Sequence, residues 1–182
     1  MATLEARCLD AFPDWLRSLA DDARALASVL EGEGAGVLQR RSAAALNYLF
    51  KSLDLIPDGL EDLGFIDDAF VIRAAADAVR LEAESELALD PTGTLARLAT
   101  EAELVQEFLD SEYGRLTKYV AGLEQGSARG RSVATILADE NARAEFVREV
   151  QEWAESYVAP GFTRDQRNLV KLRAFLLAKL PA

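Results

Sequence analysis

Six carboxylates lie between residues 52 and 68, and no lysine or arginine occurs from residue 52 to residue 72. Grouped carboxylates can bind a hard cation, cap a helix, or work as a general acid and base. The apolar residues among them predict that this segment is buried, and buried carboxylates need a cap, a partner or an ion. We call residues 52–68 the acidic corner; its acids are Asp54, Asp58, Glu61, Asp62, Asp67 and Asp68.

The sequence leaves three interpretations of the acidic corner open. In the architectural one, which we favour, Asp67 caps a helix, Asp68 lies in its first turn and Asp58 closes a turn, so no cofactor is expected. In the second, Asp54, Asp58, Asp67 and Asp68 converge on Mg²⁺ or Ca²⁺, although their spacing differs from that of an EF-hand loop. In the third, two carboxylates form an acid–base pair, which requires separated pKa values and a cleft.

Other catalytic chemistry finds little support in the sequence. The chain has no histidine, which removes Ser–His and Cys–His pairs and every zinc site that needs imidazole. Its one cysteine, Cys8, is in helical register with Leu4 and Phe12, which predicts a buried thiol. We therefore do not expect an enzyme.

The composition predicts an all-α protein. Half of the 182 residues are hydrophobic, only 5 are proline and 11 are glycine, and no segment shows the alternation of a strand. We expect a bundle of six or seven helices, with a helix–acidic corner–helix motif near residues 35–89. Residues 1–125 form the domain that contains this motif. The helices of residues 126–182 are expected to pack on the same domain.

Local signals set the expected element boundaries. Pro57 prevents the second helix, predicted for residues 35–52, from running through the acidic corner. A third helix is expected from residue 66 to residue 89, and a long helical pattern covers residues 95–123. Residues 125–131 are rich in Gly and Ser and are predicted to be a linker.

The net charge of −11 argues against a nucleic-acid binder. Residues 163–182 are an exception, because they carry five basic residues and one acidic residue. This basic segment either forms a solvated helix face or contacts an anionic surface, as in peripheral membrane binding. No transmembrane segment or signal peptide is evident, which predicts a cytoplasmic protein. The candidate contact residues are Arg164, Arg167, Lys171 and Arg173.

The stretch LFKSLDLIPDGLEDLGFIDDA resembles the motif of the YkvA-like domain, a bacterial domain of unknown function (domain of unknown function 1232). The motif match lies within residues 52–68, and the resemblance extends over residues 35–80. Ser52 and Glu61 stand where the family motif has prolines. The family brings no established reaction or ligand. The matching residues are Asp54, Leu55, Ile56, Pro57, Asp58, Gly64, Asp67 and Asp68.

The sequence therefore predicts a non-enzymatic interaction or scaffold protein that binds a protein partner or forms a homo-oligomer. The alternative is a protein that binds, or is regulated by, a divalent cation at the acidic corner.

Overall fold

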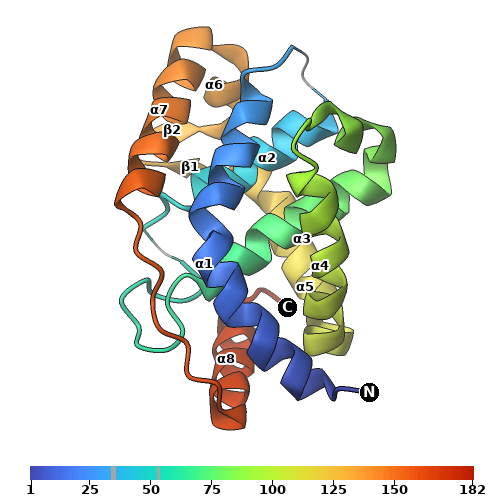
Figure 1. Cartoon of the computed structure of the whole chain (residues 1–182). Helices are drawn as coiled ribbons and strands as arrows, with labels where there is room; N and C mark the ends of the chain where they lie inside the picture. Colours follow the sequence, from blue (N-terminus) through green and yellow to red (C-terminus); the bar gives the residue numbers. More distant parts are fainter. Residues whose placement is uncertain (34–35, 53) are drawn as a thin grey trace.

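The computed structural model describes residues 1–33, 36–52 and 54–182, and the chain folds as an all-α bundle, which confirms the predicted fold class (Figure 1). The predicted start of the second helix, at residue 35, lies outside the described residues. The α-helices are α1 (Leu4–Leu30), α2 (Val37–Tyr48), α3 (Ile66–Ala83), α4 (Thr94–Leu109), α5 (Tyr113–Gly122), α6 (Val133–Ala138), α7 (Glu140–Ser156) and α8 (Gln166–Lys179). Short 3₁₀-helices cover Glu84–Leu89, Asp110–Glu112 and Leu123–Gln125.

Helix α3 lies at the centre of the bundle and packs against α1, α2, α4 and α5. Its sequence explains this position, because apolar or small residues occupy nearly every side of the helix. Phe70, Val71 and Ile72 are consecutive and all completely buried. A helix that is apolar all round has to be surrounded by other elements. The acidic corner leads directly into the N-terminus of this central helix.

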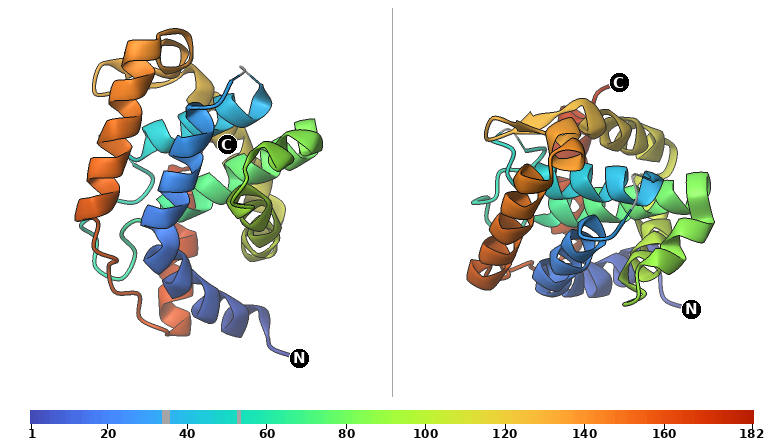
Figure 2. Two further views of the ribbon diagram at one scale, coloured as in Figure 1. Left: turned by 45° about the horizontal axis from the view of Figure 1, so that its top comes forward. Right: turned by 90° about the horizontal axis from the view of Figure 1, so that it is seen from above.

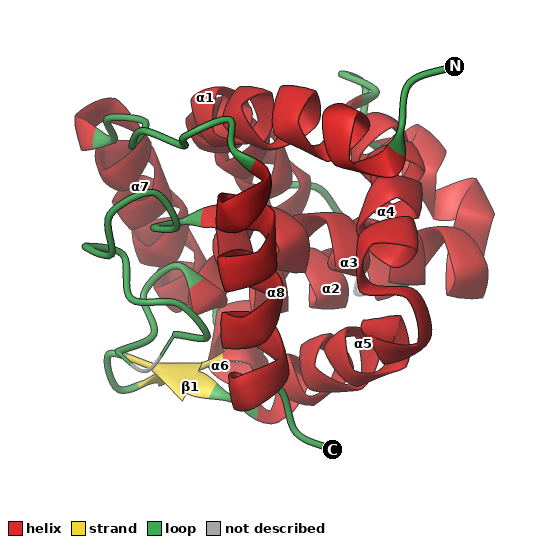
Figure 3. Cartoon of the chain, turned by 90° about the horizontal axis from the view of Figure 1, so that it is seen from below, coloured by secondary structure: helices red, strands yellow, loops and turns green. Residues whose placement is uncertain are grey.

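The C-terminal helices share the hydrophobic core of the N-terminal ones. Helix α7 lies alongside α1 in both views of Figure 2, and the Tyr157 hydroxyl just after α7 donates a hydrogen bond of 2.8 Å to the Leu16 carbonyl of α1. Residues 157–165 then cross the surface to α8, which packs on α1 (Figure 3). The core includes Phe146, Leu172 and Leu176 from this part of the chain.

The linker expected at residues 125–131 is in fact a small β-hairpin of β1 (Ser127–Ala128) and β2 (Arg131–Ser132), which corrects that prediction. The two residues between the strands, Arg129 and Gly130, have φ values of 51° and 75°. Positive φ at both central residues is what a two-residue hairpin turn requires. Strands of two residues are too short to show an alternating pattern, so the sequence did not reveal them.

Three helices end earlier than predicted. Helix α2 ends at Tyr48 and α3 at Ala83, after which a 3₁₀ turn replaces the expected continuation to residue 89. The long helix expected at residues 95–123 is divided into α4 and α5, because Asp110 adopts a positive φ of 52°. None of the described helices combines the length and the apolar character needed to cross a membrane.

Candidate functional site at the acidic corner

The acidic corner is a compact set of turns held by its apolar residues. Leu55, Ile56 and Leu63 are at most 4% exposed, as their apolar character predicts. The Gly64 N–H donates to the Leu60 carbonyl at 2.9 Å and closes one of the turns. A Cβ atom at Gly64 would lie 2.1 Å from the Asp58 carbonyl oxygen, so only glycine fits at this position.

Tyr48, the last residue of α2, joins the acidic corner to α3. Its hydroxyl donates a hydrogen bond of 2.5 Å to Oδ2 of Asp67 and accepts one of 2.7 Å from the Leu55 N–H. The same Asp67 oxygen also accepts the Ile56 N–H at 3.1 Å. Asp67 is therefore not the N-cap that we predicted; the N-cap of α3 is Phe65, and the Asp67 side chain binds the corner instead.

Four carboxylates of the corner lie close enough to repel one another. Asp67 and Asp68 are 0% and 2% exposed, Asp54 is half-buried and Asp58 is exposed. Burial, together with the charges of Asp58 and Asp67, raises the pKa of Asp54 to about 7. Burial raises the pKa of Asp67 to about 6, although the hydrogen bonds from Tyr48 and Ile56 oppose the shift.

The pKa of Asp68 is raised well above its ordinary value. Burial is the main cause, followed by the charges of Asp67, Asp58 and Asp54. Burial also raises the pKa of Asp58. The nearby positive charge of Lys51 lowers the pKa of Asp54, but it does not outweigh the effect of burial.

Three buried carboxylate oxygens in the corner have no hydrogen-bond partner among the described residues. They are Oδ1 of Asp54, Oδ1 of Asp67 and Oδ2 of Asp68. Unpartnered buried acceptors are rare and call for a proton, a water or an ion. Within the described parts of the chain, no group of three or more acidic or thiol side chains is already arranged to hold a metal ion. The cation site predicted at Asp54, Asp58, Asp67 and Asp68 therefore stays a prediction.

The segment after α7 covers one side of the corner. Thr163 donates to Oδ1 of Asp62 through its N–H (3.2 Å) and its hydroxyl (2.7 Å), and Asn168 donates to the Asp62 carbonyl at 3.0 Å. The Phe65 and Tyr157 rings meet edge to face, with centroids 5.3 Å apart. Nothing in the sequence indicated that residues about 100 positions apart would meet here.

A family model matches residues 42–73. Its description is "Protein of unknown function (DUF1232)", and the match extends from the second turn of α2 through the acidic corner into the first half of α3. This finding confirms the resemblance to the YkvA-like domain for that segment of the chain. No curated protein and no solved structure matches the chain.

The four predicted anionic-surface residues have different environments. Arg173 donates to the Phe108 and Leu109 carbonyls at the C-terminus of α4, at 2.6 and 3.3 Å. Arg164 forms an exposed ion pair with Asp10 at 3.0 Å. Arg167 and Lys171 are exposed. Two of the four therefore bind other parts of the protein, while the other two face solvent.

A buried ionic network, which we did not predict, joins α1, α3 and α4. The Arg73 guanidinium is completely buried, lies 4.0 Å from the centroid of the Trp15 ring and pairs with Glu101 at 2.6 Å and Asp22 at 3.6 Å. Asp22 is 1% exposed and also pairs with Arg97. The sequence held one signal for this network, because Arg73 is the single basic residue between positions 52 and 79.

Proposed function

We propose that this protein is a non-enzymatic, cation-responsive protein whose acidic corner binds Mg²⁺ or Ca²⁺. The observation that carries the proposal is the set of three buried, unpartnered carboxylate oxygens on Asp54, Asp67 and Asp68. A hard divalent cation takes oxygen ligands and would supply the positive charge that these side chains lack. The cation would thereby join the corner to the start of α3.

The burial of the corner favours an ion over an organic substrate. Tyr48, Asp67 and Asp68 are all at most 2% exposed, so a substrate would reach them only if the bundle opened. Asp58 is exposed and Asp54 is half-buried, which leaves an approach for a small ion from solvent. Cys8 is completely buried, and burial raises the pKa of its thiol to about 12, which makes it a poor nucleophile. These features support a non-enzymatic role.

The affinity should be weak, because the carboxylates would have to turn toward the ion before they coordinate it. We expect a Kd of about 10⁻⁴ to 10⁻³ M, the range of the weakest natural calcium sites. A cation at ten times its Kd would then raise the free energy of unfolding by about 1.4 kcal/mol. For a chain of this length, that corresponds to a rise in Tm of about 3–6 °C.

Calorimetric melting of the chelator-treated protein, with and without millimolar Mg²⁺ or Ca²⁺, tests this proposal. We expect a rise in Tm for the native chain and none for Asp68→Asn, which keeps the shape of the side chain but not its charge. Glu61→Gln is the matched control, because Glu61 is an exposed acid of the same corner. An unchanged native Tm, or an equal rise in Asp68→Asn, would refute cation binding at this site.

A second candidate function is binding of a protein partner or of a second copy of the chain. Its support is a pair of exposed leucines, Leu81 near the end of α3 and Leu89 at the end of the 3₁₀ segment that follows. Their exposed fractions are 74% and 67%. Light scattering after size exclusion tests self-association: we expect a dimer that Leu81→Gln with Leu89→Gln dissociates. A native monomer that captures no partner would count against this candidate.

A further inference from the structure

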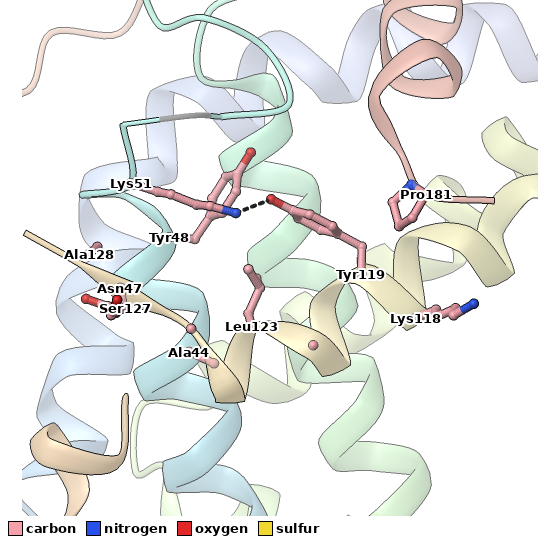
Figure 4. A pocket seen from close by; sticks show the side chains of 12 residues that line it. Ala44, Asn47, Tyr48, Lys51, Lys118, Tyr119, Leu123, Ser127, Ala128 and Pro181 are labelled. Atoms are coloured by element: carbon pink, nitrogen blue, oxygen red, sulfur yellow. Dashed lines mark hydrogen bonds between the residues drawn. The ribbon is translucent and has the colours of Figure 1, made fainter. Parts of the chain in front are cut away.

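A pocket of about 320 Å³ opens between α2, α5 and the hairpin, and Tyr48 forms part of its lining (Figure 4). Its volume is at the lower end of the range of small-molecule sites. The rings of Tyr48 and Tyr119 meet edge to face, with centroids 6.1 Å apart. Apolar groups make up most of the remaining lining, with Ala44, Leu123, Ala128 and Pro181 among them.

Lys51 gives this pocket an ammonium group on which an acid, Asp54, acts without a close ion pair. Its Nζ donates one hydrogen bond of 2.9 Å to the Tyr119 hydroxyl and lies 5.1 and 5.9 Å from the centroids of the Tyr119 and Tyr48 rings. No carboxylate of the described residues forms an ion pair with it at 4.0 Å or less. An ammonium has three donors, so two remain for a ligand. The ammonium is therefore available to an external anion, which would add to its longer-range attraction to Asp54.

Asn47 contributes the second polar feature of the lining. This side chain is 4% exposed, and its Nδ2 donates to the Arg131 carbonyl at 3.3 Å. Its Oδ1 is buried and has no hydrogen-bond partner within the described chain. A buried amide oxygen without a donor carries a desolvation cost, which a ligand N–H or O–H would remove. A ligand that complements this pocket therefore carries a hydrogen-bond donor for Asn47 and an anionic group for Lys51.

We propose that this pocket binds a small organic carboxylate that also carries a hydrogen-bond donor. The carboxylate pairs with the Lys51 ammonium, and the donor serves Oδ1 of Asn47. The apolar body of the ligand lies against the tyrosine rings and Leu123. Lys118 also lines the pocket, but its Nζ points away from Lys51 and donates to the Ala182 backbone oxygen at 3.3 Å, so Lys51 supplies the charge for the ligand (Figure 4). The proposal does not depend on the cation site, although Lys51 acts electrostatically on Asp54 and the Tyr48 hydroxyl donates to Asp67.

Four probe molecules of similar shape separate the contribution of the ligand's carboxylate from that of its hydrogen-bond donor. Titration calorimetry or saturation-transfer NMR would compare 4-hydroxyphenylacetate with its amide, with tyramine and with 4-methylphenylacetate. We expect the hydroxy acid to bind about tenfold more tightly than the amide, a difference of about 1.4 kcal/mol. Tyramine should not bind, and the methyl analogue should bind more weakly than the hydroxy acid. Binding of none of the acids at millimolar concentration, or equal binding of acid and amide, would overturn the proposal.

Two variants locate the binding. Lys51→Met should abolish the preference for acid over amide, whereas Lys171→Met, at an exposed lysine elsewhere, should leave it unchanged. Gly122→Leu should block every probe, because Gly122 lines the pocket. A Cβ atom there meets nothing within 4 Å, and leucine favours the helix over glycine, so this variant should fold. Undiminished binding to either pocket variant would show that the probes bind elsewhere.

Discussion

Replacing Tyr48 with phenylalanine removes the hydroxyl that joins α2 to the acidic corner and α3. The change leaves the Leu55 N–H buried without an acceptor, which costs about 1–3 kcal/mol. It also removes the Tyr48 donor from Asp67, a hydrogen bond to a charged group, which is worth about 1.5–3 kcal/mol. Asp67 keeps the Ile56 N–H as a donor. We therefore expect the free energy of unfolding to fall by about 3–5 kcal/mol.

The size of this loss should depend on pH. The Tyr48 hydrogen bond lowers the pKa of Asp67, because the donor stabilises the ionised carboxylate. Without it, the pKa of Asp67 should rise above its native value of about 6. At pH 8, an ionised and poorly solvated Asp67 then destabilises the folded variant. At pH 5 it does not. The destabilisation should therefore be larger at pH 8.

Urea denaturation followed by circular dichroism, at both pH values, measures the effect. For a domain of this length, the expected loss corresponds to a fall in Tm of about 6–20 °C. Tyr119→Phe is the matched control, since its hydroxyl only accepts from Lys51 and its loss should cost less than about 1 kcal/mol. If the two variants lose the same stability, or if the Tyr48→Phe loss is independent of pH, the bridging role of this hydroxyl is wrong.

Three further predictions follow from the structure. Because the pKa of Asp54 is raised to about 7, its carboxyl binds a proton more tightly in the folded protein than in the unfolded chain. In the presence of chelator, Tm should therefore fall between pH 5 and pH 8. Asp54→Asn should reduce this dependence of Tm on pH. Arg73→Met removes the buried partner of Asp22 and Glu101, which both keep Arg97, and should cost about 3 kcal/mol in urea denaturation. Gly64→Ala should cost at least about 1–3 kcal/mol, because its Cβ would overlap the Asp58 carbonyl.

Each of these predictions has a contrary result. A Tm slope that is the same in Asp54→Asn would mean that other groups produce the pH dependence, such as Asp67 and Asp68, whose pKa values burial also raises. If Arg73→Met lowers the free energy of unfolding by less than about 1 kcal/mol, the network contributes no more to stability than surface ion pairs do. Gly59→Ala is the control for Gly64→Ala, because a Cβ there meets nothing within 4 Å; equal losses would disprove the close-contact argument.

The sequence predicted the features that depend on composition and local pattern. The all-α class, the burial of Leu55 and Ile56, and the start of α3 at Ile66 all follow from apolar spacing and turn chemistry. These signals are local, because helix periodicity and turn residues act over a few positions. The family resemblance added a motif but no information on what its carboxylates bind.

What the sequence could not give are the contacts between distant residues. The Asp67 side chain was assigned to a helix cap because its partners, Tyr48 and Ile56, come from a tertiary arrangement and not from helix-start chemistry. The Arg73 network spans three helices, and the Asp62–Thr163 contact spans about 100 residues. Propensity carries no information about such pairs, whereas a basic residue alone in an apolar helix, like Arg73, is a sign that a buried acid faces it.

Tyr48 contributes to both the acidic corner and the Lys51 pocket. Its hydroxyl is fixed inside the acidic corner, while its ring forms part of the wall of the Lys51 pocket (Figure 4). Ring and hydroxyl are one rigid unit, so an occupant that tilts the ring also pulls the phenol away from Asp67. Such coupling is reciprocal. If a ligand in the pocket changes the affinity of the acidic corner for a proton or a metal ion, binding of that proton or metal ion changes the affinity for the ligand by the same factor. Tyr48→Phe would keep the wall of the pocket and remove this coupling between the pocket and the acidic corner.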